Sequence, residues 1–180
     1  MMRLARPTKI EGDNLLARIG TAGLRAARPE RLRWDDDYEV STELGPELDE
    51  LFESLRQNVG TALVRDVRYL KWRFLDCPTH EYRVVLARRR SKLTGYLAFC
   101  VANDLLLVKD WLGVDARAVR TLFGAAIDEA CAADVASASV TMLETHRDVG
   151  VLRTLGFTTR PETSTTITYA PSNLPWRGDV

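Results

Sequence analysis

The sequence has little of the residue types that build metal sites. It holds only three cysteines and two histidines in 180 residues. Cys77, Cys100 and Cys131 are scattered along the chain and lack the C-x-x-C spacing that is typical of zinc ligands. We therefore expect no bound metal, and we interpret the cysteines as small, mostly buried apolar groups.

Long apolar runs and an excess of charge are also missing. No stretch approaches the roughly 20 apolar residues that a membrane-spanning helix needs, and the first residues lack the apolar centre of a signal peptide. These absences predict a cytoplasmic protein without a membrane span. Because 25 basic residues balance 25 acidic ones, bulk electrostatics give no reason to expect nucleic acid as a partner.

What remains is the composition of an ordinary globular domain, with 46% apolar and 28% charged residues. We predict a domain over residues 33–170, an irregular tail over 171–180, and an N-terminal arm or connector over 1–32. The arm is dense in basic residues, and Leu15, Leu16 and Ile19 would share one face of a short helix. That face could pack on the domain or on a second copy of the chain.

Hydrophobic periodicity and turn residues predict the order of elements in the domain. Helices of period 3.6 are expected at about 46–58, 66–75, 116–133 and 148–155. Strands are expected at 33–44, 82–89, 93–101, 105–112, 136–143 and 163–169. Short polar connections between the strands at 82–89, 93–101 and 105–112 predict an antiparallel meander.

This order of elements, with Leu155-Gly156-Phe157 after the last short helix, resembles the GNAT superfamily of acyl-CoA N-acyltransferases. The likeness covers about residues 33–169. The stretch 66–74, followed by Pro78 and Tyr82, is similar to the opening of the second half of tandem-GNAT proteins that are often associated with polysaccharide genes. On that comparison the chain resembles a second half standing alone, with its arm as the former connector.

The resemblance implies an α/β fold in which a split mixed sheet of six or seven strands carries helices on both faces. The strands at 105–112 and 136–143 would be neighbours, and acyl-CoA, most simply acetyl-CoA, would lie in the gap between them. Backbone groups near Trp111, Leu112 and Gly113 would hold the pantetheine chain. The pyrophosphate would sit at the start of the next helix, because a helix N-terminus offers unpaired N–H donors.

Two arginines and one carboxylate complete the candidate site. Arg117 and Arg120 could face the pyrophosphate with their side chains, or they could be ordinary exposed helix residues. Asp110, an acidic residue inside an apolar strand, is the best candidate for the general base that deprotonates the acceptor amine. It could instead point to solvent or pair with Arg68, Arg73 or Lys109.

The sequence also departs from the family pattern. The glycine run expected at the phosphate loop is missing, and Leu152 stands where many relatives carry a tyrosine that protonates the leaving thiolate. Two hypotheses therefore stay open. The chain is an N-acyltransferase acting on an unidentified amine, for which the subgroup suggests an amino sugar, or it is a degenerate domain that serves as a structural or dimerisation module.

Overall fold

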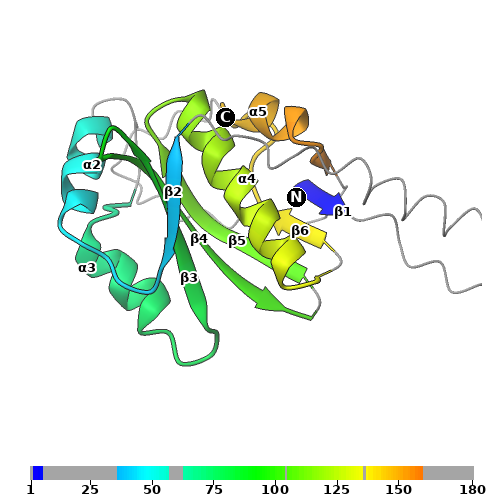
Figure 1. The fold of residues 1–180 in the computed structure, drawn as a ribbon, viewed down its shortest axis with the longest axis horizontal. Coiled ribbons are helices and arrows are strands. Elements are labelled where there is room, and N and C mark those ends of the chain that lie inside the picture. The colour runs from blue at the N-terminus through cyan, green and yellow to red at the C-terminus, as the bar shows by residue number, and fades with distance from the viewer. Residues whose placement is uncertain (1, 6–35, 57–62, 104, 136, 160–180) are drawn as a thin grey trace, which may run out of the picture.

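The computed structural model describes residues 2–5, 36–56, 63–103, 105–135 and 137–159, which form a mixed sheet with helices on both faces (Figure 1). The seven strands lie in the order β2-β3-β4-β5-β6-β1-β7, which confirms the predicted sheet of six or seven strands. Their bounds are β1 Met2–Ala5, β2 Asp37–Ser41, β3 Tyr82–Arg89, β4 Lys92–Ala102, β5 Leu105–Gly113, β6 Ser137–Val140 and β7 Thr158–Thr159.

Helices cover the two faces of the sheet unequally. One face carries α2 (Glu47–Arg56), α3 (Val67–Leu70) and the π-helical turn η1 (Lys71–Leu75), which continues α3. The other face carries the long helix α4 (Ala116–Ala132) and the short helix α5 (Val149–Thr154). Figure 1 shows α2 and α3 on one side of the sheet and α4 on the other.

The centre of the sheet is the antiparallel meander β3-β4-β5, as the short connections predict. Arg90 and Ser91 form the first two-residue turn, both with positive φ angles of 51° and 65°. Such angles match the twist of paired strands in a tight hairpin. All strand pairs are antiparallel except β5 and β6, which run parallel and are joined by α4 as a crossover.

Each face of the sheet has its own core because both faces are covered. Phe99, Leu122 and Phe123 are fully buried between the sheet and α4. Leu70 and Tyr96 are buried between the sheet and the α2–α3 layer. This double coverage explains why the central strands read as nearly continuous apolar runs.

Local signals in the sequence set the helix ends. The Asp66 carboxylate accepts a 2.7 Å hydrogen bond from the Tyr69 N–H and so caps α3. Gly156 follows α5 with a φ of 88°, a left-handed conformation that favours glycine. Asp66 thus marks the start of α3, and Gly156 follows the end of α5.

The described strand β1 was not predicted, since it belongs to the segment interpreted as an arm. It lies between β6 and β7 and pairs antiparallel with both. Leu15, Leu16 and Ile19 of the arm, the strand predicted at 163–169 and the tail at 171–180 lie outside the described residues. Among the described helices, none combines the length and apolar character that crossing a membrane requires.

Candidate functional site

The sheet splits between β5 and β6. Their parallel pairing joins residues 105–108 to residues 137–140 and ends there. β5 continues to Gly113, still paired with β4, after a bulge between Val108 and Asp110. A bulge bends its strand and increases the local twist, so the second half of β5 turns away from β6. This arrangement confirms that the strands predicted at 105–112 and 136–143 are neighbours in a split sheet.

Side chains from the loop between β6 and α5 approach the open half of β5. The Trp111 indole Nε1 donates a 2.9 Å hydrogen bond to Oδ2 of the buried Asp148. The same indole packs edge-on against Phe123 of α4 and lies 5.2 Å from the His146 ring, centroid to centroid. Arg147 Nη2 donates a 3.3 Å hydrogen bond to the Gly113 carbonyl. These contacts join the two walls of the split on its α4 side.

Asp110 begins this open half of β5, at the bulge. Its carboxylate accepts hydrogen bonds from Arg65 Nε at 3.1 Å to Oδ1 and 3.0 Å to Oδ2. The Tyr96 hydroxyl donates a further 2.8 Å bond to Oδ2. The partner is therefore Arg65 and none of the arginines or the lysine that sequence analysis had proposed. Arg65 lies 45 residues before Asp110, a separation at which sequence spacing carries no pairing signal.

Burial and charge perturb the two partners of Asp110. Burial alone would lower the pKa of Arg65, but the charge of Asp110 and its hydrogen bond outweigh this effect and raise that pKa. Burial, followed by the negative charge of Asp110, raises the pKa of Tyr96 well above its ordinary value. At neutral pH Arg65 is therefore a guanidinium cation and Tyr96 a neutral phenol, and both donate to Asp110.

The helix start that should receive a pyrophosphate is capped by the protein itself. The Asp115 carboxylate accepts a 2.8 Å hydrogen bond from the Ala118 N–H, as an N-cap residue does. The backbone before it is tight, since a Cβ on Gly113 would lie 2.8 Å from Cγ2 of Val119. Arg120 is exposed on α4.

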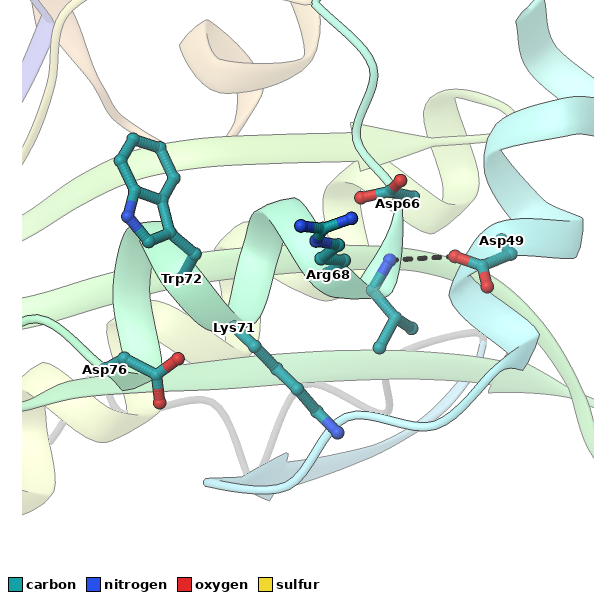
Figure 2. A pocket seen from close by; sticks show the side chains of 7 residues that line it. Asp49, Asp66, Arg68, Lys71, Trp72 and Asp76 are labelled. Carbon is teal, nitrogen blue, oxygen red and sulfur yellow. Dashed lines mark hydrogen bonds between the residues drawn. The ribbon is translucent and has the colours of Figure 1, made fainter.

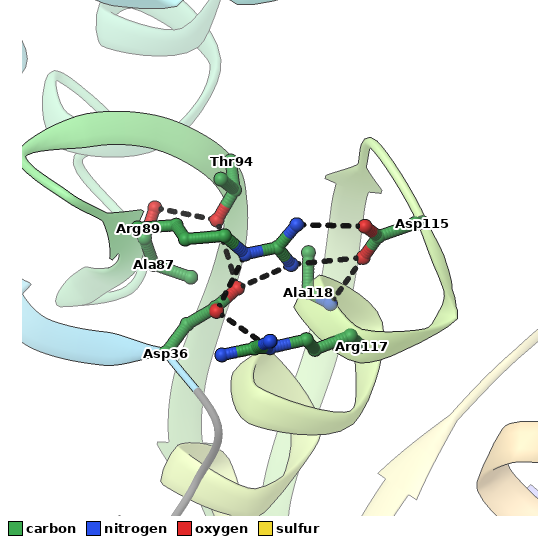
Figure 3. Close-up of polar contacts among 7 residues, drawn as sticks. All are labelled: Asp36, Ala87, Arg89, Thr94, Asp115, Arg117 and Ala118. Carbon is green, nitrogen blue, oxygen red and sulfur yellow. Dashed lines mark hydrogen bonds and ion pairs between the residues drawn. The ribbon is translucent and has the colours of Figure 1, made fainter.

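Figure 3 shows a wider polar network at this helix start. Arg89 donates to both oxygens of Asp115 at 3.0 and 3.2 Å and to both oxygens of Asp36 at 2.8 and 2.9 Å. Thr94 Oγ1 donates to Asp36 at 3.3 Å, and Arg117 Nε lies 2.9 Å from the same carboxylate. The side chain of Asp36 is completely buried, and it holds both arginines beside the start of α4.

Hydrogen bonding in this network stabilises the charged forms of its members. The hydrogen bond from Arg89 lowers the pKa of Asp115, and burial opposes this only in part. The hydrogen bonds to Asp36 and Asp115 in turn raise the pKa of Arg89. From the sequence, Arg117 was expected either to face the donor's pyrophosphate or to be an ordinary exposed helix residue. Asp36 and Arg89 were not predicted, because residues of three distant segments meet here.

Leu152 is fully buried in the core beneath α4. Its side chain has no proton to donate, so a thiolate formed in the split would take its proton from another group or from water. Tyr96 is the tyrosine that the structure brings beside a candidate catalytic residue, but its hydroxyl donates to Asp110.

A groove of about 550 Å³ lies over the outer surface of α3 and η1 (Figure 2). Trp72 lines it with 66% of its surface exposed, and its ring lies 6.0 Å from that of Tyr69, centroid to centroid. Asp49 of α2 closes one end and accepts a 2.8 Å hydrogen bond from the Val67 N–H. Trp72 therefore belongs to this open surface and not to the buried core.

Comparisons with known proteins identify the fold. No protein-family profile and no curated protein matches the sequence. A candidate acetyltransferase from Agrobacterium tumefaciens str. C58 superimposes with a TM-score of 0.52 at 15% identity, over 74% of this chain and 99% of the other. The aminoglycoside acetyltransferase meta-AAC0020 from an uncultured soil metagenomic sample, solved with sisomicin, gives 0.51 at 15% identity, over 76% and 97%.

The wild-type protein TTHA1254 from Thermus thermophilus superimposes with a TM-score of 0.50 at 17% identity, over 74% of this chain and 98% of the other. At these identities the likeness concerns the fold. Together with the split sheet, it shows that the chain has the GNAT acyltransferase fold expected from the order of its elements.

Proposed function

We propose that the chain is an N-acyltransferase that moves an acyl group, most simply acetyl, from CoA to a small amine. The observation that supports this most is the split between β5 and β6 with Asp110 at the start of its open half. Backbone groups of Trp111, Leu112 and Gly113 would hold the pantetheine chain there. The partners of Asp110 would keep its carboxylate aimed at the acceptor.

The proposed reaction needs a thioester donor and one proton acceptor. The acceptor nitrogen attacks the thioester carbonyl carbon, so an amide C–N bond forms and the C–S bond breaks. The proton released by the nitrogen passes to Asp110, directly or through a water molecule. The CoA thiolate leaves with a proton supplied by water or returned from Asp110.

The phosphates of the donor would lie at the start of α4, where Arg117 and Arg120 supply positive charge. Arg89 adds a third guanidinium, since it already binds the Asp115 carboxylate in this place. Guanidinium groups bind phosphate and carboxylate with the same fork of N–H donors. A phosphate could therefore replace Asp115 as the partner of Arg89.

Calorimetric titration of the full chain with acetyl-CoA tests this function. We expect saturable binding that Arg120→Ala weakens, while the matched variant Arg153→Ala, which removes an exposed arginine on α5, binds as the wild type does. Arg120 is the better probe, because replacing Arg117 would also break its ion pair with Asp36. Absence of binding at about millimolar acetyl-CoA would remove the proposal, since enzymes seldom work with a substrate that they bind more weakly than about 1 mM.

A second candidate function is that of a degenerate domain that acts through protein contacts. The network at the start of α4 favours it, because Asp115 already fills the position of an anionic ligand. The buried Leu152 in place of an acid agrees with it. In this case Leu15, Leu16 and Ile19 would contribute to a homodimer.

Light scattering on the full chain separates this alternative. Truncating the arm is unsuitable, since it would remove β1 from between β6 and β7. Replacing Leu15, Leu16 and Ile19 by serine leaves β1 in place. A dimer that these three changes dissociate, in a protein that acetyl-CoA does not stabilise, would favour the degenerate domain. If the wild type and the serine variant are both monomers, the degenerate dimerisation domain is contradicted.

A further inference from the structure

Arg65 and Asp110 form a preorganised pair of opposite charges next to the proposed reaction centre. Their side chains are 26% and 15% exposed, respectively, so the pair is largely desolvated yet open on one side. It belongs to the α2–α3 side of the sheet, because Tyr96, which donates to Asp110, is buried in that core.

Arg65 uses only part of its donor capacity in this pair. Its Nε donates to both oxygens of Asp110. For the two terminal nitrogens, Nη1 and Nη2, the structure records no acceptor among the described residues. These nitrogens carry four N–H donors in a planar fork, a geometry that matches the two oxygens of a carboxylate.

Asp110 keeps acceptor capacity as well. Its Oδ2 receives the Tyr96 hydroxyl and shares the Arg65 N–H, whereas Oδ1 receives only the shared N–H from the part of the chain that the structure describes. A carboxylate oxygen has two lone-pair directions. Oδ1 can therefore take one more donor, while Tyr96 and Arg65 prevent the carboxylate from rotating away.

We infer that the acceptor is a zwitterion with a carboxylate beside its reactive amine, as in an α-amino acid. The inference rests on the proposed function and specifies its substrate class. The acceptor's ammonium group binds Oδ1 of Asp110, and its carboxylate binds Nη1 and Nη2 of Arg65. The four charges then alternate around a ring, so each cation has two anionic neighbours and each anion has two cationic neighbours.

The same arrangement disfavours other amines. An amino sugar or a polyamine brings its ammonium group to Asp110 but offers no anion to Arg65, whose terminal donors then lose water without a replacement partner. A site whose buried donors are left unpaired by an incorrect substrate rejects that substrate strongly. Arg65 is thus a specificity-determining residue, and Asp110 binds the amine that reacts.

Release of CoA from acetyl-CoA, measured with a panel of the common amino acids and of their C-terminal amides, tests the inference. Each amide keeps the amine and side chain but lacks the carboxylate. At least one amino acid should react with a kcat/KM about tenfold or more above that of its amide, since a paired carboxylate is worth at least that factor. Equal or better use of the amides, or acetylation of glucosamine alone, would overturn the inference while leaving the acyltransferase intact.

Two arginine variants assign the effect. Arg65→Gln should abolish the preference for the acid over the amide by raising KM for the acid, while Arg68→Gln, an exposed arginine of α3, should keep that preference. An unchanged preference in Arg65→Gln would contradict the assignment. Circular dichroism checks that each variant is folded, and the wild-type comparison of acid with amide needs no variant.

Calorimetric titration of the reactive amino acid without a donor keeps the inference separate from the function. Binding of the acid that Arg65→Gln weakens, in a protein that does not bind acetyl-CoA, would support the zwitterion site and remove the acyltransferase. Binding of acetyl-CoA without any binding or turnover of an amino acid would remove the zwitterion site and leave the acyltransferase in place.

Discussion

Replacing Asp115 by serine should strengthen the binding of acetyl-CoA. In the proposed complex the donor's phosphates approach the start of α4, where the Asp115 carboxylate caps the helix and binds Arg89. Serine keeps a capping oxygen but removes the negative charge. Arg89 then retains Asp36 as a partner and gains free donors for a phosphate.

The size of the effect follows from the position of the carboxylate. The side chain of Asp115 is 44% exposed, so its field is close to that in water. A unit charge about 6 Å from a phosphate charge then contributes about 0.7 kcal/mol of repulsion, and two phosphate charges contribute about 1.4 kcal/mol. The dissociation constant should therefore fall between about threefold and tenfold.

Calorimetric titration at low ionic strength measures this change, and Glu50→Gln serves as the control because it removes an exposed carboxylate on α2. Thermal unfolding should show only a small loss of stability, since the exposed pair with Arg89 contributes roughly 0.2–1 kcal/mol. If Asp115→Ser is folded and binds acetyl-CoA no better than the wild type, the phosphates do not lie at the start of α4.

Two further predictions concern stability. Gly95→Ala should lower the free energy of unfolding by about 1–3 kcal/mol, because the added Cβ would lie 2.7 Å from the Leu112 carbonyl oxygen. Gly150→Ala should not, because an added Cβ there meets no described residue within 4 Å. Equal losses in the two variants would contradict the packing. The Arg89 hydrogen bond holds the pKa of Asp115 below 3.8, so its contribution to stability is complete above that pH and is lost as the pH falls through the lower, folded-state pKa. The difference in urea midpoint between the wild type and Asp115→Ser should therefore be largest well above pH 3.8 and should shrink as the pH falls below it. A difference that stays constant would refute this.

The order of the central elements could be predicted from the sequence because local signals specify it. The meander has short turns at Arg90 and Ser91, α3 begins at a capping Asp66, and α5 ends at Gly156. Each signal acts within a few residues, so one sequence suffices to identify it. The strand β1 lacks such support, since four residues form a strand only through pairing with β6 and β7.

The partners of the site residues could not be predicted, because they come from distant segments. Asp110 was singled out as a charged residue in an apolar strand, but its partner Arg65 precedes it by 45 residues. Arg117 pairs with Asp36, which precedes β2, and Arg89 reaches the start of α4 from the end of β3. A buried carboxylate must find partners, but a single sequence does not say which of 25 basic residues they are.

Amide hydrogen exchange with and without saturating acetyl-CoA tests most directly whether this chain binds an acyl-CoA in the split of its sheet. The open half of β5, residues 110–113, pairs with β4 but not with β6, so a bound pantetheine chain would supply its second partner. We predict slower exchange of these amides and of the first turn of α4, with no change in β3. Unchanged exchange throughout the chain, or protection confined to the groove over α3, would contradict the account.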